Sequence, residues 1–256
     1  MKQFNFNSLQ SFIAVALFLL AWQFVSAKGI IDPFFISSPW EILKSDVVLI
    51  NSGTVLPHLL TSLAELFIGF TLAIAAGVTI ALLLGWYEKS YAAFSPFIYG
   101  LHAIPYAVLI PLFVIWMGIS IWTKITIVFV VVLYPIIITT LSGVRNIDPS
   151  YIRLAKSFGA KDATIFKTII LPGSLPYIAA GLRIAIFRAL GGVIVSELFV
   201  GGKGLGYLIS YYGNTFQTSK LFAVIVIIVA ISTTFIRALS LIERKLSNWK
   251  LSKDRY

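Results

Sequence analysis

The chain of 256 residues is 59% apolar and only 12% charged, against about 25% charged residues in soluble domains, and its mean hydropathy is +0.94. So few charges cannot cover a surface in water, so the composition excludes a soluble protein and indicates an integral membrane protein. The chain has no cysteine and two well-separated histidines, which argues against a disulfide framework or a metal site, and its net charge of +10 falls mostly between apolar runs, which argues against nucleic-acid binding.

Six apolar runs are long enough to cross a hydrocarbon core of about 30 Å, which needs roughly 20 residues of helix. The runs cover residues 11–27, 59–85, 92–117, 121–141, 177–199 and 221–241. The first run also has features of a cleaved signal peptide, because it ends in Val25-Ser26-Ala27, but its length favours a retained span. We therefore expect an all-α, polytopic membrane protein with about six transmembrane helices, forming a single domain over residues 1–256.

The lysines and arginines predict the orientation. With the N-terminus inside, 13 of the 20 basic residues, Lys2, Lys253 and Arg255 among them, fall on the inner side and 5 on the outer side; Arg183 and Arg188 lie within the fifth span. An excess of positive charge marks the cytoplasmic side, so both termini are expected in the cytoplasm and the protein in the cell membrane. Outside, residues 28–57 form a loop in which Asp32-Pro33 and Ser38-Pro39 predict turns.

A glycine-rich segment, residues 201–206, lies on the predicted outer side. It does not match a phosphate-binding loop, because Gly204 follows Lys203 where Ser or Thr is required and Glu197 stands where the first glycine is required. A flexible external turn is the expected structure.

The long inner loop, residues 142–176, contains a predicted short helix. Asp148 can cap it, Pro149 suits its first position and Gly159 can end it. Tyr151, Leu154, Ala155 and Phe158 would then form one apolar face. A face this short cannot span a bilayer, so the helix either lies on the membrane surface or docks into a groove of another protein, and the pattern alone leaves both alternatives open.

A motif follows this helix: Gly159, nine intervening residues, and then Ile169-Ile170-Leu171-Pro172. The pattern resembles the loop signature of ABC importer permeases. Segments around it resemble the nitrate, sulfonate and taurine branch of that family, and the likeness covers most of residues 37–246; these segments are 58–63, 103–105, 111–113, 143–149, 158–160, 175–185 and 196–198.

One departure from the family pattern concerns the start of the signature. Family members usually carry Glu-Ala-Ala there, whereas this chain has Arg153-Leu154-Ala155. A contact with the ATPase that depends on the glutamate therefore cannot be carried over. Ala155 and Gly159 still match, and their small size permits the close backbone approach that a helix in a protein groove needs.

The resemblance implies a permease subunit of an ATP-driven importer, with a core region at 58–241 and no enzymatic activity of its own. The chain lacks a phosphate loop, so a partner must supply the energy. In similar proteins a pair of permeases, here a homodimer, sits on two cytoplasmic ABC ATPases that bind the ATP, and an extracytoplasmic solute-binding protein delivers the substrate. No cofactor or metal is implied for this chain. The residues expected to couple it to the ATPase are Tyr151, Leu154, Ala155, Phe158, Gly159, Ile169, Leu171 and Pro172.

Two charges within the spans are candidates for the translocation path. At 1.5 Å per residue, Arg188 lies roughly 16 Å into the fifth span, near mid-membrane, and Glu65 roughly 10 Å below the outer end of the second. Buried ionisable groups usually pair or face a watery cavity. Arg188 would therefore either attract an anionic substrate or form a structural pair with Glu65 or a helix carbonyl, and the pair is favoured because buried arginine is seldom left unpaired.

The resemblance predicts a small anionic cargo of the nitrate, sulfonate or taurine type, with a thiamine-precursor pyrimidine as the alternative. An ion-coupled secondary transporter is a second alternative, but it should show internal repeats and paired intramembrane carboxylates, whereas only Glu65 and Glu197 are acidic within the spans and no clear repeat is present. A membrane scaffold without transport activity is the third.

Overall fold

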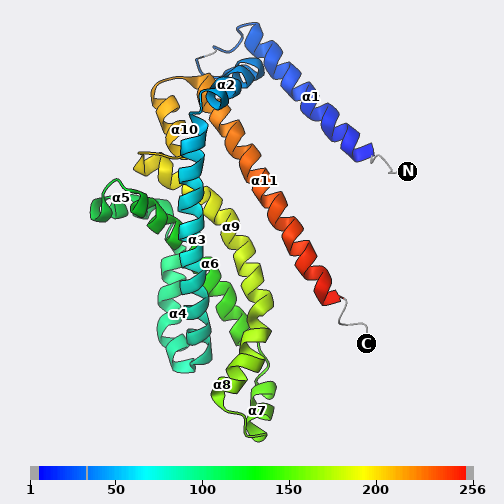
Figure 1. The fold of residues 1–256 in the computed structure, drawn as a ribbon, viewed down its shortest axis with the longest axis vertical. Coiled ribbons are helices and arrows are strands. Elements are labelled where there is room, and N and C mark those ends of the chain that lie inside the picture. Colours follow the sequence, from blue (N-terminus) through cyan, green and yellow to red (C-terminus); the bar gives the residue numbers. More distant parts are fainter. Residues whose placement is uncertain (1–5, 33, 252–256) are drawn as a thin grey trace. The chain divides into compact units, whose positions relative to one another are not determined.

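The computed structural model describes residues 6–32 and 34–251, and these form helices joined by short loops, without a strand (Figure 1). Lys2, Pro33, Lys253 and Arg255, used above for topology and turns, lie outside the described residues. The chain divides into two compact units, one comprising residues 59–207 and the other the remaining residues at both ends. The helices are α1 (Phe6–Ala27), α2 (Pro39–Asn51), α3 (Val55–Trp86), α4 (Glu88–Ala103), α5 (Tyr106–Met117), α6 (Ile121–Arg145), α7 (Pro149–Ser157), α8 (Asp162–Ile165), the π-helix η1 (Phe166–Ile170), α9 (Leu171–Val200), α10 (Leu205–Asn214) and α11 (Thr218–Leu251).

The all-α prediction is confirmed. Among the described residues, four stretches are long and apolar enough to cross a membrane: α3, α6, the continuous stretch Asp162–Val200 and Thr218–Arg237 of α11. The pair α4 and α5 passes the same test only as one broken span. The described apolar part of α1, Ile13–Ala27, is shorter than a span, so the first of the six predicted spans stays a prediction.

The third predicted run, residues 92–117, is not one straight helix. It breaks between α4 and α5, which meet at a bend of 95°. The break falls at Ile104-Pro105, where both residues have extended ψ angles of 123° and 116°. Proline has no N–H to donate and disfavours helical backbone in the residue before it, so this dipeptide ends α4.

Helices α3 and α6 pack closely through glycines. Gly69, Gly77 and Gly85 of α3 lie against Val128, Ile136 and Val144 of α6, respectively, and a Cβ on any of the three would come within 3.0 Å of its valine or isoleucine partner. Contacts that advance by eight residues on both helices show that α3 and α6 run in the same direction. Small residues at such an interface let two backbones approach, which is a main source of helix association in a membrane.

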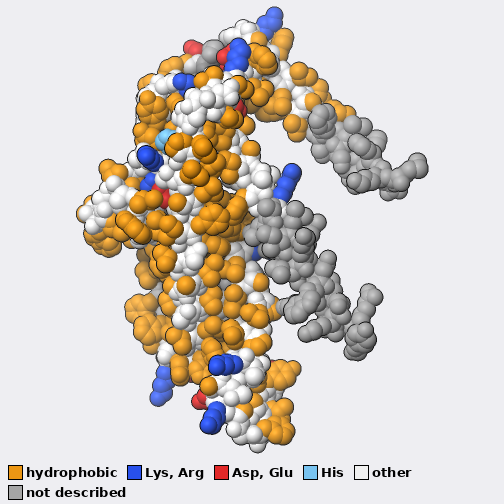
Figure 2. All heavy atoms as spheres, in the orientation of Figure 1, with side chains coloured by type: hydrophobic (Ala, Val, Ile, Leu, Met, Phe, Trp, Pro, Cys, Tyr) orange, Lys and Arg blue, Asp and Glu red, His pale blue; other side chains and the backbone are white. Residues whose placement is uncertain are grey.

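Helix α9 packs antiparallel against α6, with Gly181 opposite Thr139 and Tyr177 opposite Gly143. Helices α3, α6 and α9 thus form the centre of the unit at residues 59–207. Figure 2 shows hydrophobic side chains over much of its visible surface, and large apolar groups such as Phe67 (51% exposed) and Ile115 (78%) face outward, as expected for contact with lipid or another subunit.

The other unit contains α1, α2 and α11. Ser38-Pro39, predicted as a turn, instead begins α2: the Ser38 hydroxyl accepts the N–H of Glu41 and Pro39 occupies the first position. The indole of Trp22 on α1 donates to the Ser37 carbonyl at 2.9 Å, and the Ser37 and Ser219 hydroxyls lie 2.7 Å apart. The predicted external loop at 28–57 therefore contains an ordered helix.

Candidate functional site

The predicted short helix is α7, and its boundaries follow from its capping residues. The Asp148 carboxylate accepts the N–H of Ser150 at 2.8 Å, and Pro149 takes the first position. At the other end, Gly159 has φ +76° and the N–H groups of Gly159 and Ala160 bond the carbonyls of Lys156 and Ala155. This is a Schellman arrangement, in which a glycine takes the left-handed conformation that other residues disfavour. The helix predicted from Asp148, Pro149 and Gly159 is confirmed.

The apolar face of α7 is exposed in this chain. Tyr151, Leu154 and Phe158 are 60%, 57% and 83% exposed, respectively. They border a groove of about 630 Å³, which we call the coupling groove; its lining comprises Asn146, Ile147, Asp148, Tyr151, Leu154, Ala155, Phe158, Thr168, Ile169, Pro172 and Gly173. Six of the eight residues expected to couple to the ATPase, four before the motif and two at its end, therefore line one concave surface.

The other two expected residues lie elsewhere. Leu171 packs against the buried cluster of Leu82, Val144 and Ile170 and does not line the groove. Gly159 has no side chain to offer and ends α7, with open space around its Cβ position. Within this structure, Leu171 supports the groove from the core and Gly159 sets where α7 stops.

The π-helix η1 connects α8 to α9, a feature that the sequence pattern did not predict. Its Phe166 packs edge-on against Trp86 of α3, with ring centroids 6.1 Å apart, and Ile170 is buried in the core. Ile169, the residue before Ile170, lines the groove with Pro172. Short π-helical turns are frequent at functional sites. Here the turn fixes one wall of the coupling groove to the membrane-spanning helices.

Ion pairs connect the ends of α6 and α4 and the helices α7 and α8. Arg145, at the end of α6, forms an ion pair with Glu88 at the start of α4, and its guanidinium lies 4.4 Å from the ring centroid of Tyr91. Lys156 and Asp162 approach to 3.7 Å, but both are more than half exposed, so their attraction contributes little. Arg153, at the position where the resemblance leads one to expect glutamate, is exposed on α7.

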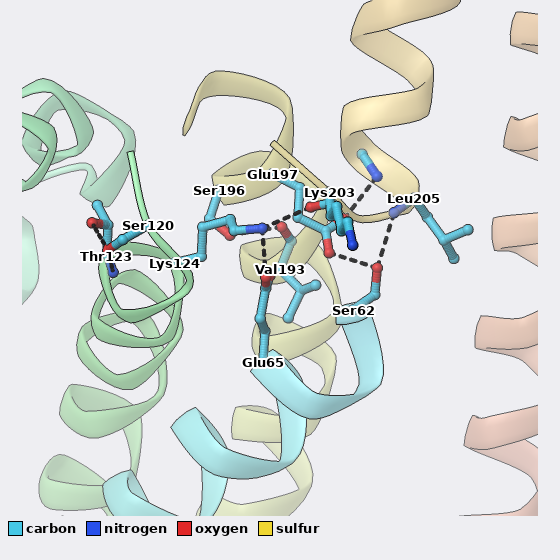
Figure 3. A network of polar contacts seen from close by, with 11 residues as sticks. Ser62, Glu65, Ser120, Thr123, Lys124, Val193, Ser196, Glu197, Lys203 and Leu205 are labelled. Atoms are coloured by element: carbon cyan, nitrogen blue, oxygen red, sulfur yellow. Dashed lines mark hydrogen bonds and ion pairs between the residues drawn. The ribbon is translucent and has the colours of Figure 1, made fainter. Parts of the chain in front are cut away.

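A second candidate region is a buried ion network, which we define as Ser62, Glu65, Lys124 and Glu197 (Figure 3). Lys124 Nζ lies 2.5 Å from Glu65 Oε1 and donates to the Lys203 carbonyl at 2.7 Å. The Ser62 hydroxyl donates to Glu197 Oε1 at 2.5 Å and accepts the N–H of Leu205 at 2.9 Å. The N–H of Gly206 donates to Glu197 Oε2 at 2.7 Å.

This network corrects the expected pairing of Glu65 with Arg188. Glu65 is fully buried and its ion-pair partner is Lys124, the fourth residue of α6, while Arg188 is exposed on α9. Although Lys124 lies near the end of an apolar run, its side chain turns inward and is only 3% exposed. Because Glu65 is enclosed by α6 and α9, it does not face open space in this chain.

The network also corrects the prediction of a flexible turn at residues 201–206. Three backbone groups of residues 201–206, from Lys203 and from Leu205 and Gly206 at the start of α10, bond to buried side chains. A side chain at Gly206 would overlap the carbonyl of Ile194, so the close approach requires glycine. The loop is therefore held at the ends of α3, α6 and α9. Lys124, Ser62 and Glu197 were not predicted as site residues; their signal is that each is polar within an apolar run.

Comparison with known proteins identifies related chains. The model of a family described as "Binding-protein-dependent transport system inner membrane component" matches residues 69–248. A Bacillus subtilis permease protein named for the transport of aliphatic sulfonates is 28% identical over 250 residues, covering 98% of this chain and 91% of the relative. The taurine transport system permease protein of Escherichia coli is 28% identical over 240 residues, covering 92% and 87%.

A third related permease and one solved structure are also similar to this chain. The formylaminopyrimidine transport permease protein of Halalkalibacterium halodurans is 29% identical over 246 residues, covering 96% of this chain and 98% of the relative. A solved structure described as an amino acid ABC transporter with histidines superposes with a TM-score of 0.63 at 18% identity, covering 78% of this chain and 97% of that one. The likeness at that identity concerns the fold alone.

Proposed function

This chain belongs to the family of binding-protein-dependent transport system inner membrane components, the membrane-spanning subunits of ABC importers. We propose that its coupling groove binds a partner ATPase and transmits the conformational change that ATP hydrolysis causes in it. The protein is a multi-pass inner-membrane transport component and not an enzyme. Its family implies an ABC ATPase and a solute-binding protein as partners.

The coupling groove carries the proposal for the ATPase contact. Three large apolar side chains of α7 are more than half exposed, and they border a concave space together with Ile169 and Pro172. A flat bilayer surface would not fill a concave groove, whereas a protein can insert side chains into it, so the groove favours protein docking over a membrane-surface helix. The roles of Gly159 and Leu171 are indirect: they set the length of α7 and hold the groove against the core.

We further propose that a second copy of the chain completes the translocation path. Exposed side chains on α9 include Ile184, Phe187 and Arg188, in the middle of a membrane-spanning stretch. A charged group at that depth is costly unless it faces protein or a watery cavity. Since Glu65 is paired with Lys124, Arg188 is available to a path between two copies, where its charge would favour an anionic solute.

The proposed cargo is a small anion of the sulfonate or taurine type, as named for two relatives, and the alternative is a formylaminopyrimidine, as named for a third. With both termini in the cytoplasm, the coupling groove would face the ATPase and the glycine-rich loop would face the solute-binding protein. The excess of basic residues at the predicted inner side supports this orientation.

The test is copurification with an ATPase, followed by ATP-driven uptake in proteoliposomes. Phe158→Asp places a charge on the most exposed apolar side chain of the groove and should abolish both ATPase binding and uptake. Ser150→Asp adds the same charge to the polar start of α7, outside the groove, and should leave both intact. Equal losses in the two variants, or ATPase binding by Phe158→Asp at the level of the unchanged protein, would refute the proposed contact.

A further inference from the structure

The buried ion network contains more negative than positive charge. Glu65 and Glu197 are fully buried and Lys124 is 3% exposed, so water reaches none of them appreciably. The two carboxyl groups interact with each other as well as with Lys124. The charged groups that face the network are Glu65 from α3, Lys124 from α6 and Glu197 from α9; Lys203 contributes its carbonyl, and its side chain is exposed. With every group ionised, these residues would bury one net negative charge.

An uncompensated buried charge is costly, and two carboxyl groups that share one site usually retain a proton. The hydrogen bonds show where this proton fits. Both oxygens of Glu197 already accept fixed donors, from Ser62 and from the N–H of Gly206. Glu65 Oε2, by contrast, is buried without a hydrogen-bond partner among the described residues. A proton shared between the two carboxyl groups would give this oxygen a partner and would neutralise the site.

We propose that Glu65 and Glu197 form a buried proton-binding site, which holds one proton beside Lys124 while the glycine-rich loop is closed. The proton belongs to the carboxyl pair and not to either residue alone. This site is distinct from the coupling groove and does not depend on the identity of the cargo or the ATPase.

The site links proton binding to the position of the glycine-rich loop. Leu205 and Gly206 donate their N–H groups to Ser62 and Glu197, so opening the loop breaks these bonds and admits water to the carboxyl pair. Carboxyl groups in water ionise at neutral pH, so opening releases the proton. Since the closed state binds one more proton than the open state, the open population should rise about tenfold for each pH unit across the neutral range.

Hydrogen exchange at the amides of Leu205 and Gly206, in the full chain reconstituted in lipid and corrected for the intrinsic chemical rate, measures this opening. The unchanged protein should show the tenfold dependence. Glu65→Gln leaves one carboxylate facing one ammonium, so its opening should not depend on pH. Glu41→Gln, an exposed carboxyl in α2, is the matched control and should behave as the unchanged protein. Opening independent of pH in the unchanged protein, or an unaltered dependence in Glu65→Gln, would overturn the proposal.

Infrared spectroscopy provides a second measurement that does not require the Glu65 variant to fold. The unchanged protein at neutral pH should show the C=O stretching band of a protonated carboxyl group. Burial also raises the pKa of Asp46 in α2, so the spectrum is recorded on Asp46→Asn as well, to separate its contribution. A band that persists in Asp46→Asn supports the site, and the absence of any such band in Asp46→Asn overturns it.

Discussion

Lys124 and Glu65, 59 positions apart in the sequence, meet at 2.5 Å between Nζ and Oε1 in the interior of the helical unit. Removing one partner of a buried pair typically costs about 3–5 kcal/mol, because the other charge is left without compensation. Lys124→Met should approach that loss, since two carboxyl groups remain and the Lys203 carbonyl loses its donor. Glu65→Leu should cost less, because Glu197 can still balance Lys124.

Thermal unfolding of the single variants and of Lys124→Met/Glu65→Leu checks this order. The double variant replaces the pair by apolar groups and should recover part of the loss caused by Lys124→Met alone. Strictly additive losses would show that the two side chains are not energetically coupled.

Ser62→Ala should loosen the glycine-rich loop. The hydroxyl is the acceptor for the Leu205 N–H and a donor to Glu197, so its removal leaves both buried groups short of a partner. We expect a loss of about 1–3 kcal/mol and faster amide exchange at Leu205. Ser62→Thr keeps the hydroxyl and is the control; if it loosened the loop as much as alanine does, steric fit rather than hydrogen bonding would explain the effect.

Gly159→Val should impair coupling without preventing membrane insertion. Gly159 has φ +76°, a conformation that costs an ordinary residue about 1–2 kcal/mol, although space for a side chain is open. The end of α7 should fray and displace Phe158 from the groove, which reduces ATPase copurification. Gly159→Asn, a residue that tolerates this conformation, should retain most of the binding. Full ATPase binding by Gly159→Val would contradict the role given to this turn.

The first turn of α7 should become less stable in acid, because the Asp148 carboxylate caps it. The N–H donated by Ser150 stabilises the ionised carboxylate and holds the pKa of Asp148 below its ordinary value. The capping contribution to stability is therefore fully present above the ordinary pKa of aspartate. It is lost as the pH falls through the lower pKa that Asp148 has in the folded protein. Amide exchange in residues 150–154 should rise over that range. Asp148→Asn keeps an acceptor without a titratable group, so its protection should stay constant there.

Arg153→Glu should weaken ATPase binding, and more so at low salt. Arg153 is exposed on α7, and Lys161 and Lys167 on the same loop are exposed as well, so a docking partner is expected to present acidic groups. Reversing one charge would introduce repulsion that salt screens. Affinity measured for the copurified ATPase at two salt concentrations tests this, with Ser157→Glu as a control for adding a charge nearby. Tighter binding by Arg153→Glu would contradict the prediction that the partner surface is acidic.

The sequence predicted the helix α7 well because its signals are local. Asp148, Pro149 and Gly159 act on the backbone within a few residues of themselves, and the apolar spacing of Tyr151, Leu154 and Phe158 needs only helical geometry. The groove itself was harder to predict from the sequence. It depends on the π-helical turn at η1, which brings Ile169 and Pro172 to α7 through packing of Phe166 on Trp86, a contact between residues 80 positions apart.

The buried ion network was predicted incorrectly for a related reason. Glu65 and Arg188 were paired because both are charged within spans, but pairing depends on which helix faces are turned toward one another, and those faces are set by the glycine contacts of α3 with α6. Lys124 sits near a helix end, where a lysine normally extends to water. Only the tertiary arrangement shows that its ammonium turns inward, to Glu65 and the Lys203 carbonyl.

The regular glycine contacts between α3 and α6 restrict how the membrane-spanning region can rearrange. Each of Gly69, Gly77 and Gly85 holds a branched side chain of α6, and the contacts recur every eight residues, or about 12 Å of helix. Sliding one helix past the other by a single turn, or about four residues, would bring Ala73 and Ala81 against two of these branched side chains, and even their Cβ atoms need more space than the glycines leave. Alternation between inward-facing and outward-facing states should therefore rotate α3 and α6 as one rigid body, with strain concentrated at the Ile104-Pro105 break and in the loops.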